Sequence, residues 1–590
     1  MAHPLKPFRC GLLRAAMLAA LVLCARCGGE RGPLLIIGLD AANWDSMDEL
    51  MAQGQLPNLA EFVRTGTAGE LATYVPTASP ALWTTIATGQ SPDKHGISFR
   101  VLKLDERGEH EMLSALSSNE RLVPALWNVC TDHGVRSAFV GWWATWPAET
   151  IDGYMVTDRV HDAAVEHTAF PPGLREDLAQ AGVFDGALPP EQERLIREVR
   201  AQFAAWRRGV EEGSVPWRGS VPDVARYLDD LGERISAYRR IMAMDYATER
   251  ITHYLMDRDR SLRVVAPYFW YLDVCQHLLW KYWRPQDFTL DPEEQRIFAP
   301  LVPEYYRFLD GVVGRLCRHR SAPVVILSDH GMESSTAERC INDLFDVEGL
   351  LQDMGWLTLK PDGSPDLARS RAYVHAESRQ MRLLTVSVVG REPDGTVAAA
   401  DLEPTAAKLT ADLAALQAMP SGEPIFKDVR MLTAHDKSYK AGEFVVYVFA
   451  QADVAATINL HAPLSDSLQL GPQCFGLTRW NRWQPGASGQ HTEGPPGIVI
   501  LHGAPFKRGA RLVGARLHDI APTVLAVLGL PVADDLEGKV LSDAFSPRFA
   551  RQQIPTVPSY GPRVGRRTAE SGESGDAAII EQLRVLGYIR

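Results

Sequence analysis

The sequence predicts an α/β fold in which helices flank a mostly parallel central sheet. Unbroken apolar runs of strand length occur at residues 33–40, 136–143, 263–273, 322–331 and 497–503, and helical patterns lie between them along the chain. Strands that are apolar throughout are typical of a sheet covered on both faces. Their alternation with helices favours parallel pairing through crossover connections. No internal repeat interrupts this order.

Length and charge limit the function classes. The chain has 590 residues, which is enough for a large core with insertions, about two to four domain equivalents. Its net charge is −12 and its pI is about 5.8. Nucleic-acid binding is therefore not expected, because such proteins normally carry a basic face. The five cysteines after residue 27 show no CxxC spacing, and a domain of this size does not need disulfides, so the sequence leaves open one bridge whose partners it does not assign.

The N-terminus has the pattern of an export signal. Basic residues precede an apolar run at 15–25 that is too short to span a bilayer. We expect residues 1–27 to be a signal peptide and the mature protein to be periplasmic or extracellular. Cys24 and Cys27 offer sites for a lipid anchor, which would tether the protein to a membrane. The alternative is a buried helix of the mature protein.

The remaining chain is expected to form one catalytic domain, residues 33–545, with two insertions. Residues 161–232 are charged and helical in pattern, and they interrupt the strand–helix alternation. Residues 370–450 combine strand-like and helix-like segments, as a small α+β subdomain would. Residues 548–590 form a C-terminal tail whose last part is an amphipathic helix expected to dock on the body. Insertions of this kind commonly form the walls of a substrate pocket.

Three of the predicted strands end in an aspartate: Asp40, Asp273 and Asp329. A single aspartate at a strand end usually caps a turn. Three at the carboxyl edge of one parallel sheet would repel one another unless cations bind there. Open α/β sheets place their ligand sites at this edge. The sequence therefore predicts a metal site.

Histidines accompany these carboxylates. His277 follows Asp273 by one helical turn, His330 follows Asp329 directly, and His491 precedes the last apolar run. Three carboxylates and three imidazoles suit two divalent ions, with zinc the best match and manganese the alternative. Two such ions carry more charge than the carboxylates remove, so the surplus favours a phosphate or sulfate group. A second Asp-His-Gly sequence at 132–134 follows a helix pattern, and we exclude it.

Ser79 is the candidate nucleophile. It stands where a helix N-cap belongs, and Pro80 takes the first helical position. We expect free backbone amides and the positive end of the helix dipole around its hydroxyl. Both favour an alkoxide and a phosphoryl oxyanion. A purely structural cap is the alternative.

These residues resemble the alkaline phosphatase superfamily, and in particular its type I phosphodiesterase/nucleotide pyrophosphatase family. The matching stretches are "IIGLDAANWD", "PTASPALWTTIATGQSPDKHGI", "LDVCQH", "SDHGM" and "GQHTEGPPGIVILHG". The resemblance implies an alkaline-phosphatase-like three-layer sandwich. It also implies that one metal is held by Asp40, Ser79, Asp329 and His330, and the other by Asp273, His277 and His491.

The implied activity is hydrolysis of small phosphoric esters through a covalent phosphoserine on Ser79. Diesterases of this family often have an asparagine shortly after "HGI", where this chain has Arg100. A guanidinium at this position would bind two phosphoryl oxygens and favour a monoester, unless Arg100 is a surface residue. Oligomeric state is left open by the sequence.

Three other functional hypotheses compete with hydrolysis of phosphoric esters. Sulfatases share the fold, but they need a C/S-x-P-x-R pattern, and Ser79 is followed immediately by Pro80. A phosphotransferase or phosphomutase of the same superfamily is a second alternative. The third is a non-catalytic binding module on the same scaffold. The complete ligand set argues against the last of these, because a decayed site is expected to lose costly buried charges.

Overall fold

The structure is a computed structural model. It describes the following residues: 32–75, 77–97, 101–104, 110–113, 117–217, 224–288, 290–318, 322–334, 347–361, 365–377, 381–392, 394–419, 421–432, 438–441, 444–447, 452–458, 467–470, 473–476, 488–491 and 494–563. The expected signal peptide, Arg100 and the terminal amphipathic helix lie outside them. None of the described helices has both the length and the apolar character required to cross a bilayer.

A nine-stranded mixed sheet forms the centre of the molecule, in the order β22-β2-β21-β9-β1-β8-β5-β6-β7. Its strands, in that order, are Ala510–Arg516, Thr67–Ala72, Gly497–His502, Val324–Leu327, Leu34–Leu39, Val264–Phe269, Ser137–Val140, Gly153–Val156 and Ala169–Phe170. The consecutive strands β9, β1, β8, β5 and β6 pair in parallel. The prediction of a mostly parallel sheet is confirmed.

Strand β21 departs from the parallel order. It pairs antiparallel with both β9 and β2. The apolar run at 497–503 does not indicate the direction of β21, because a strand buried on both faces has the same apolar pattern whether it is parallel or antiparallel to its neighbours. The reversal means that β21 begins, rather than ends, at the edge where β9, β1 and β8 end.

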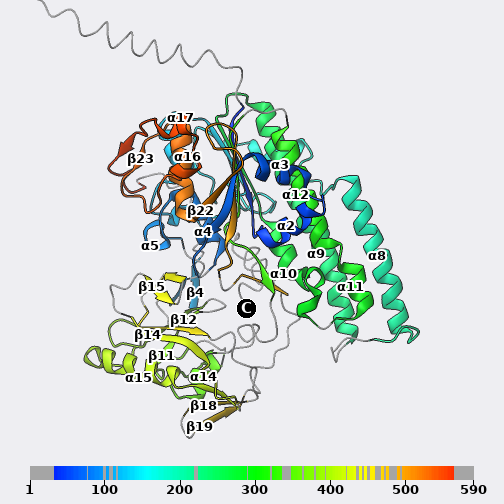
Figure 1. The fold of residues 1–590 in the computed structure, drawn as a ribbon. Coiled ribbons are helices and arrows are strands. Elements are labelled where there is room, and N and C mark those ends of the chain that lie inside the picture. The colour runs from blue at the N-terminus through cyan, green and yellow to red at the C-terminus, as the bar shows by residue number, and fades with distance from the viewer. Residues whose placement is uncertain are drawn as a thin grey trace, which may run out of the picture.

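Helices cover both faces of the sheet, which gives three layers (Figure 1). On one side lie α4 (Ser79–Thr88), α5 (Pro92–His95), α16 (Ile520–Leu528) and α17 (Pro547–Ala550). On the other lie α2 (Trp44–Ala52), α3 (Pro57–Thr65), α8 (Pro190–Glu211), α9 (Val224–Arg258), α10 (Tyr271–Trp283), α11 (Pro292–Phe298) and α12 (Leu301–Cys317). Helix α6 (Leu126–Asp132) precedes β5, and α7 (Leu174–Gln180) follows β7.

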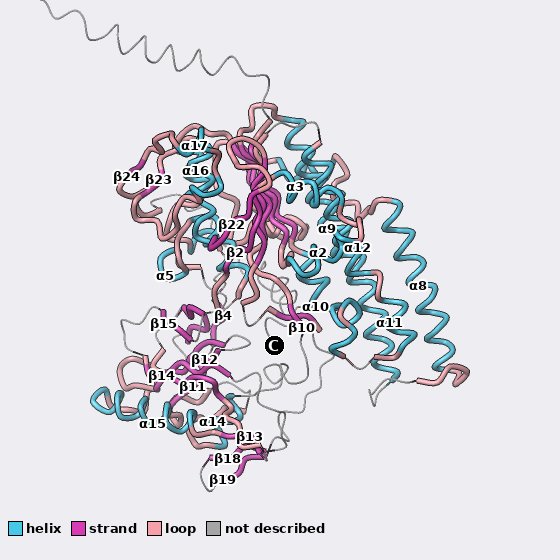
Figure 2. Tube along the Cα trace, in the orientation of Figure 1, coloured by secondary structure: helices cyan, strands magenta, loops and turns pink. Residues whose placement is uncertain are grey.

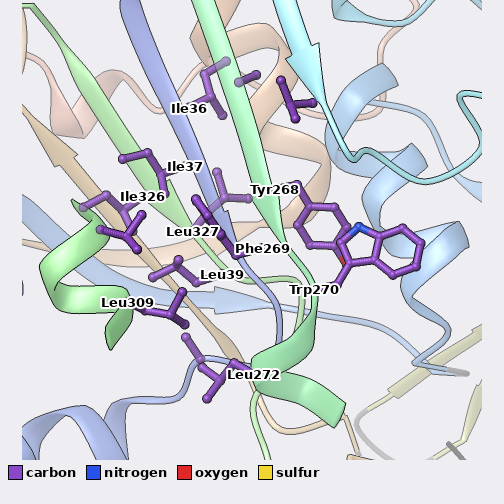
Figure 3. Close-up of a cluster of buried hydrophobic side chains, with 14 of the residues drawn as sticks. Ile36, Ile37, Leu39, Tyr268, Phe269, Trp270, Leu272, Leu309, Ile326 and Leu327 are labelled. Atoms are coloured by element: carbon purple, nitrogen blue, oxygen red, sulfur yellow. The ribbon is translucent and has the colours of Figure 1, made fainter. Parts of the chain in front are cut away.

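The main core forms where the central strands meet the helices. All six residues of β1 and of β8 are buried, and so is each residue of β9. Figure 3 shows Ile36, Ile37, Ile326 and Leu327 of these strands packed in one cluster with Leu309 of α12. These strands are consequently rigid, and the residues at their ends have fixed positions.

A smaller unit with its own core lies below the sheet in Figure 1. It contains a four-stranded antiparallel sheet in the order β11-β12-β17-β14. Its buried cluster runs from Val347 to Ala456 and includes residues of both α14 and α15. Its elements are α14 (Val347–Asp353), β11 (Ala372–Glu377), β12 (Met381–Val386), α15 (Leu402–Ala414), β13 (Gln417–Met419), β14 (Phe426–Met431), β15 (Ser438–Ala441), β16 (Phe444–Tyr447), β17 (Val454–Ile458), β18 (Ser467–Leu470) and β19 (Gln473–Gly476).

Strands β13, β18 and β19 form a three-stranded sheet. Four two-stranded pairings complete the described sheets, and Figure 2 shows the distribution of strand and helix. They involve β3 (Val101–Leu104) with β4 (His110–Leu113), β10 (Glu333–Ser334) with β20 (Gly489–Gln490), β15 with β16, and β23 (Val532–Ala533) with β24 (Thr556–Val557). Residues 161–232 contain α7, α8 and the first part of α9, which continues without a break to Arg258.

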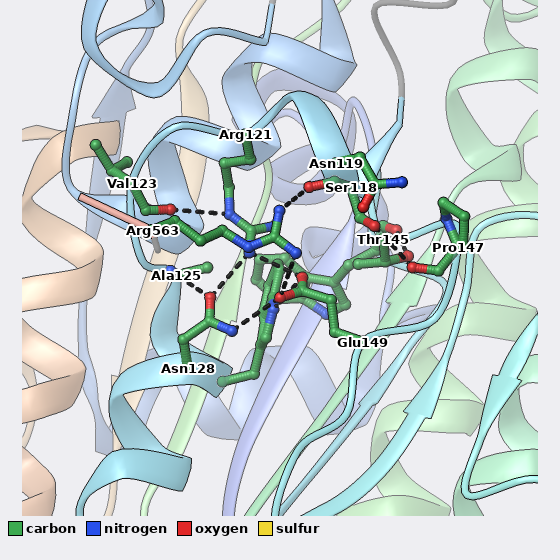
Figure 4. A network of polar contacts seen from close by, with 12 residues as sticks. Ser118, Asn119, Arg121, Val123, Ala125, Asn128, Thr145, Pro147, Glu149 and Arg563 are labelled. Carbon is green, nitrogen blue, oxygen red and sulfur yellow. Dashed lines mark hydrogen bonds and ion pairs between the residues drawn. The ribbon is translucent and has the colours of Figure 1, made fainter. Parts of the chain in front are cut away.

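The described end of the tail is anchored by a buried charge network (Figure 4). The carboxylate of Glu149 pairs with Arg121 at 2.8 Å and with Arg563 at 2.9 Å, and all three side chains are buried. Asn128 and the Trp127 indole also donate to Glu149. The network joins residues that are far apart in sequence. It also pairs the Glu149 carboxylate, whose charge would be strongly unfavourable if it were buried alone.

Candidate metal centre

The three strand-end aspartates meet at one edge of the sheet. Strands β9, β1 and β8 are adjacent and parallel, so Asp40 and Asp329 follow their strands at the same edge. Helix α10 begins two residues after β8 ends, which places Asp273 in its first turn and His277 one turn later. His491 precedes the reversed strand β21 and therefore reaches the same edge.

Ser79 begins α4, and its placement differs slightly from the expectation. Ala78 is the N-cap, and Ser79 is the first helical residue. The amides of Ala81 and Leu82 both donate to the Ala78 carbonyl, and Pro80 has no amide hydrogen. The expectation of free backbone amides around Ser79 is therefore wrong for Ala81 and Leu82. The Ser79 amide and the helix dipole are what this turn offers to an anion.

A close approach between α4 and β1 sets the position of Ser79. A Cβ at Gly38 would lie 2.5 Å from an atom of the Trp83 ring, so only glycine permits this packing. Trp83 also lies against Tyr268 of β8, with ring centroids 4.0 Å apart. The fully buried α4 is consequently held against the two strands that carry Asp40 and lead to Asp273.

One group of candidate ligands consists of Asp273, His277 and His491, and its three ligand atoms lie within 4.8 Å of one another. The Nε2 atoms of the two histidines are 3.1 Å apart. The Asp273 Oδ1 atom lies 3.3 Å from His277 Nε2 and 3.7 Å from His491 Nε2. Two nitrogens and a carboxylate oxygen therefore converge on one point.

A second group surrounds His330. Its Nε2 lies 3.3 Å from the Ser79 hydroxyl, 3.6 Å from Asp40 Oδ1 and 3.5 Å from Asp329 Oδ2. Ligand atoms of Asp40, Asp273 and His330 also lie within 4.8 Å of one another, which puts Asp273 between the two groups. The His330 and His491 rings stack with centroids 3.8 Å apart. All seven side chains predicted from the sequence are thus within one cluster.

Burial makes this cluster unfavourable without cations. Asp40 and Asp273 are 3% exposed and Asp329 is fully buried. Burial, and then repulsion from Asp329 and Asp273, raises the pKa of Asp40 well above its ordinary value. Burial also raises the pKa of Asp329, although the nearby His330 opposes this shift. Among the described residues, no donor reaches Asp40 Oδ1 or either carboxylate oxygen of Asp329 by hydrogen bonding.

Hydrogen bonds orient the three imidazoles. The Nδ1 atoms of His277 and His330 face the carbonyls of Gly489 and Gly331 at 2.7 and 2.9 Å. A carbonyl only accepts, so each Nδ1 carries the hydrogen. The Thr77 hydroxyl donates to the His491 carbonyl at 2.8 Å and must therefore accept from His491 Nδ1 at 2.9 Å.

In the neutral form of the three rings, which is the form that binds a metal ion, the Nε2 atoms present lone pairs to the cluster. Neighbouring lone pairs repel unless a cation lies among them, and an Nδ1–H bonded to an oxygen is the usual arrangement of a metal-bound histidine. The residues present therefore fit divalent metal ions.

Some contributing residues were not predicted. Tyr268 donates a hydrogen bond to Asp40 Oδ2, and Thr77 orients His491. Tyr268 lies in an apolar strand, where nothing in the local pattern distinguishes it from a core residue. The excluded Asp-His-Gly sequence ends α6, with Asp132 and His133 exposed and Gly134 at φ 65°. The exclusion of Asp132 and His133 as metal ligands agrees with their exposed position at the end of α6. Arg100 lies outside the described residues.

Comparison with known proteins identifies the family. A family model described as type I phosphodiesterase / nucleotide pyrophosphatase matches residues 34–461, which is well over half of the chain. The chain belongs to the type I phosphodiesterase/nucleotide pyrophosphatase family. This family is part of the alkaline phosphatase superfamily and is metal-dependent. The protein is accordingly a phosphoric ester hydrolase of the phosphodiesterase/nucleotide pyrophosphatase type.

Other comparisons give more distant similarity. No curated protein matches the sequence. Human ectonucleotide pyrophosphatase/phosphodiesterase 5 is 12% identical over 86% of this chain and 97% of that chain, with a TM-score of 0.46. The murine protein is 11% identical over 87% of this chain and 100% of its own, with the same TM-score. An inactive variant of the murine protein in complex with AMP gives the same values.

Gly489 provides a test of how closely this phosphodiesterase-family site is packed. A Cβ at this residue would lie 2.6 Å from the Gln276 carbonyl oxygen and 2.9 Å from Met332 Sδ. G489A must therefore push β20 away from α10 and disturb the His277–Gly489 bond. We expect metal affinity to fall about 10- to 100-fold, measured by competition with a chromophoric chelator. G232A, whose Cβ would meet Phe203 at an ordinary 3.5 Å, is the control and should bind normally.

Asp245 gives a pH-dependent prediction. Its Oδ2 atom accepts from the Tyr271 amide at the start of α10 and from the Tyr305 hydroxyl, and burial raises its pKa from 3.8 to about 7. The folded protein then holds a proton that the unfolded chain has released, so this residue lowers stability as pH rises from 3.8 to about 7.

D245N cannot ionise and should remove this loss. Relative to wild type, its unfolding free energy should rise by up to ~4 kcal/mol between about pH 4 and about pH 8, as measured by urea unfolding. D257N on the same helix, where Asp257 is exposed, is the control and should show no such trend. A flat difference between D245N and wild type would contradict the assignment.

Proposed function

We propose that this chain hydrolyses phosphoric esters at a site for two divalent metal ions, with Ser79 as the nucleophile. The observation that carries the proposal is the convergence of three imidazole Nε2 atoms and three buried carboxylates beside one hydroxyl. Asp40, Ser79, Asp329 and His330 would hold one ion, and Asp273, His277 and His491 the other. Zinc is the expected metal, with manganese as the alternative.

Bound divalent ions would supply positive charge that lowers the pKa of the serine hydroxyl and stabilises the phosphoryl oxygens. The chain's own groups do the rest. The Ser79 hydroxyl, which lies 3.3 Å from His330 Nε2, gives its proton to solvent water, and its oxygen attacks phosphorus. The bond from phosphorus to the leaving oxygen breaks, that oxygen takes up a proton from water to give the alcohol, and a phosphoserine forms. Water then attacks that phosphorus from the opposite side, releasing phosphate or its monoester and restoring Ser79.

The surroundings of Ser79 assist the negative charge in both steps. Ser79 is the first residue of α4, so its hydroxyl lies at the positive end of a ten-residue helix. Ser79 is 3% exposed, and the low polarity around it strengthens its interactions with charge. Tyr268 holds Asp40 by donating to its Oδ2, which leaves Oδ1 directed at His330.

Substrate class and location are further parts of the proposal. A small-molecule phosphate ester is the expected substrate, and the murine structural neighbour was solved with AMP. The sequence pattern of residues 1–27 supports export to the periplasm or the cell exterior, and Cys24 or Cys27 would be the site of any lipid tether. Arg100 would bind phosphoryl oxygens and favour monoesters.

S79A tests the nucleophile. Removing the hydroxyl should lower turnover at least ~10³-fold, because the group that would carry the phosphoryl group is then absent. Metal content, measured by atomic emission on the full-length protein, should remain near that of wild type, since six ligands stay in place. S137A removes a buried hydroxyl from the start of β5 and should leave turnover unchanged. Full activity in S79A would show that the nucleophile has been wrongly assigned.

A substrate panel tests the reaction class and Arg100 together. We expect zinc- or manganese-loaded protein to hydrolyse phosphate mono- or diesters and to leave a sulfate ester intact. R100N should raise the ratio of diester to monoester turnover by at least about tenfold, since the guanidinium favours the more highly charged ester. R64N, at an exposed arginine of α3, is the control and should keep the wild-type ratio. Sulfate turnover would instead favour the sulfatase reading.

A further inference from the structure

A buried network without charged groups joins the Asp40 turn to α10. The Gln276 side chain is fully buried, and its Nε2 donates to the Ala41 carbonyl at 3.0 Å. Its Oε1 accepts from Asn43 Nδ2 at 3.2 Å and from the Tyr306 hydroxyl at 3.1 Å. Both lone pairs of the Gln276 Oε1 atom are thus used. One hydrogen of the Gln276 amide NH₂ group bonds the Ala41 carbonyl of the turn.

The turn that Gln276 holds needs such support. Ala41 follows Asp40 and has φ 57°, a left-handed conformation that residues with a Cβ rarely adopt. This conformation redirects the chain immediately after the Asp40 carboxylate. Asn43 next caps α2 by accepting from the Ser46 amide. The Asp40 turn is therefore fixed between a strained residue and a helix cap.

A second tether holds the same turn from the neighbouring strand. The Ser328 hydroxyl donates to the Ala42 carbonyl at 2.7 Å and accepts from the Ile498 amide at 2.8 Å. Ser328 directly precedes Asp329, just as Gln276 directly precedes His277. The segments that carry Asp40, His277 and Asp329 are thus locked together by the neighbours of the ligands.

We propose that Gln276 is a positioning residue for the metal centre, which holds the Asp40 turn and α10 at the spacing that lets both ligand groups share Asp273. This inference rests on the proposed function. The hydrogen bonds of the Gln276 side chain go to Ala41, Asn43 and Tyr306, none of which is one of the seven ligands, so Gln276 takes no part in the chemistry. Its effect is on their relative placement, to which metal sites are sensitive because ligands must converge within tenths of an ångström.

Q276M separates this role from simple packing. Methionine has nearly the same volume and cannot form any of the three hydrogen bonds. Q192M is the matched control: Gln192 of α8 is also buried and donates to Glu304 at 2.8 Å, away from the metal centre. The full-length proteins are stripped of metal, and Zn²⁺ affinity and metal-free thermal unfolding are then measured for each.

We expect both variants to unfold at lower temperature than wild type, while only Q276M binds Zn²⁺ about 10- to 100-fold more weakly. Turnover of Q276M should recover when Zn²⁺ is raised in the same proportion, which a loss of folding would not allow. Equal Zn²⁺ affinities in Q276M and Q192M would overturn the role of Gln276. Absence of Zn²⁺ binding and turnover in wild type would overturn the proposed function instead.

Y306F covers the case in which Q276M does not fold. It removes one hydroxyl that donates to Gln276 Oε1 and accepts from Asn43 Nδ2 at 3.0 Å, and leaves the ring in place. Zn²⁺ affinity should fall in the same direction, by about threefold or more. An unchanged affinity in folded Y306F would contradict the positioning role.

Discussion

Repulsion among three buried carboxylates is the constraint on which the rest of the site depends. Asp40, Asp273 and Asp329 lie at one sheet edge, almost fully removed from water, and burial raises the pKa of Asp40 and Asp329. Such an arrangement is tolerable only if protons or cations compensate it. Because oxygen acceptors hold the three Nδ1 hydrogens, the neutral imidazoles direct their Nε2 atoms at metal ions that would compensate this charge.

The surrounding structure supports this cluster chiefly with neutral groups. Carbonyls of Gly331 and Gly489 and the Thr77 hydroxyl fix the imidazoles, while Gln276 and Ser328 hold the Asp40 turn. Neutral hydrogen-bonding groups can be buried at low cost once they are paired, and they leave the charge balance to the ligands and the metal. The ordered surroundings also limit rearrangement of the site when metal is bound.

The sheet explains why residues from distant parts of the chain can meet so closely. Parallel strands β9, β1 and β8 deliver their ends to one edge, and reversed β21 brings the residues before it to the same edge. Gly38 lets the Trp83 ring approach β1, so the nucleophile helix joins them. The short β10–β20 pairing then fixes the loop after His330 against the segment before His491. The ligands beside these strands, Asp40, Asp329, His330 and His491, are thus positioned by strand pairing, while α4 and α10 position the other three.

The sequence by itself determined the fold class, the family and the identity of the seven candidate side chains. Continuous apolar strands and an aspartate at each of three strand ends are local patterns. Such patterns can be recognised in the sequence without knowledge of tertiary contacts. The same is true of the four-residue spacing of Asp273 and His277, which α10 converts into one face.

Only the tertiary structure decided how those side chains are arranged. It decided the direction of β21 and the placement of Ser79 in the first turn of α4 rather than at its cap. It also decided the roles of Tyr268, Thr77 and Gln276, whose hydrogen bonds join residues more than two hundred positions apart. His491 also lies beyond the span matched by the family. Hydrogen bonds between distant segments cannot be predicted from the sequence pattern around either partner, because each partner lies in a segment that has only the pattern of a buried element.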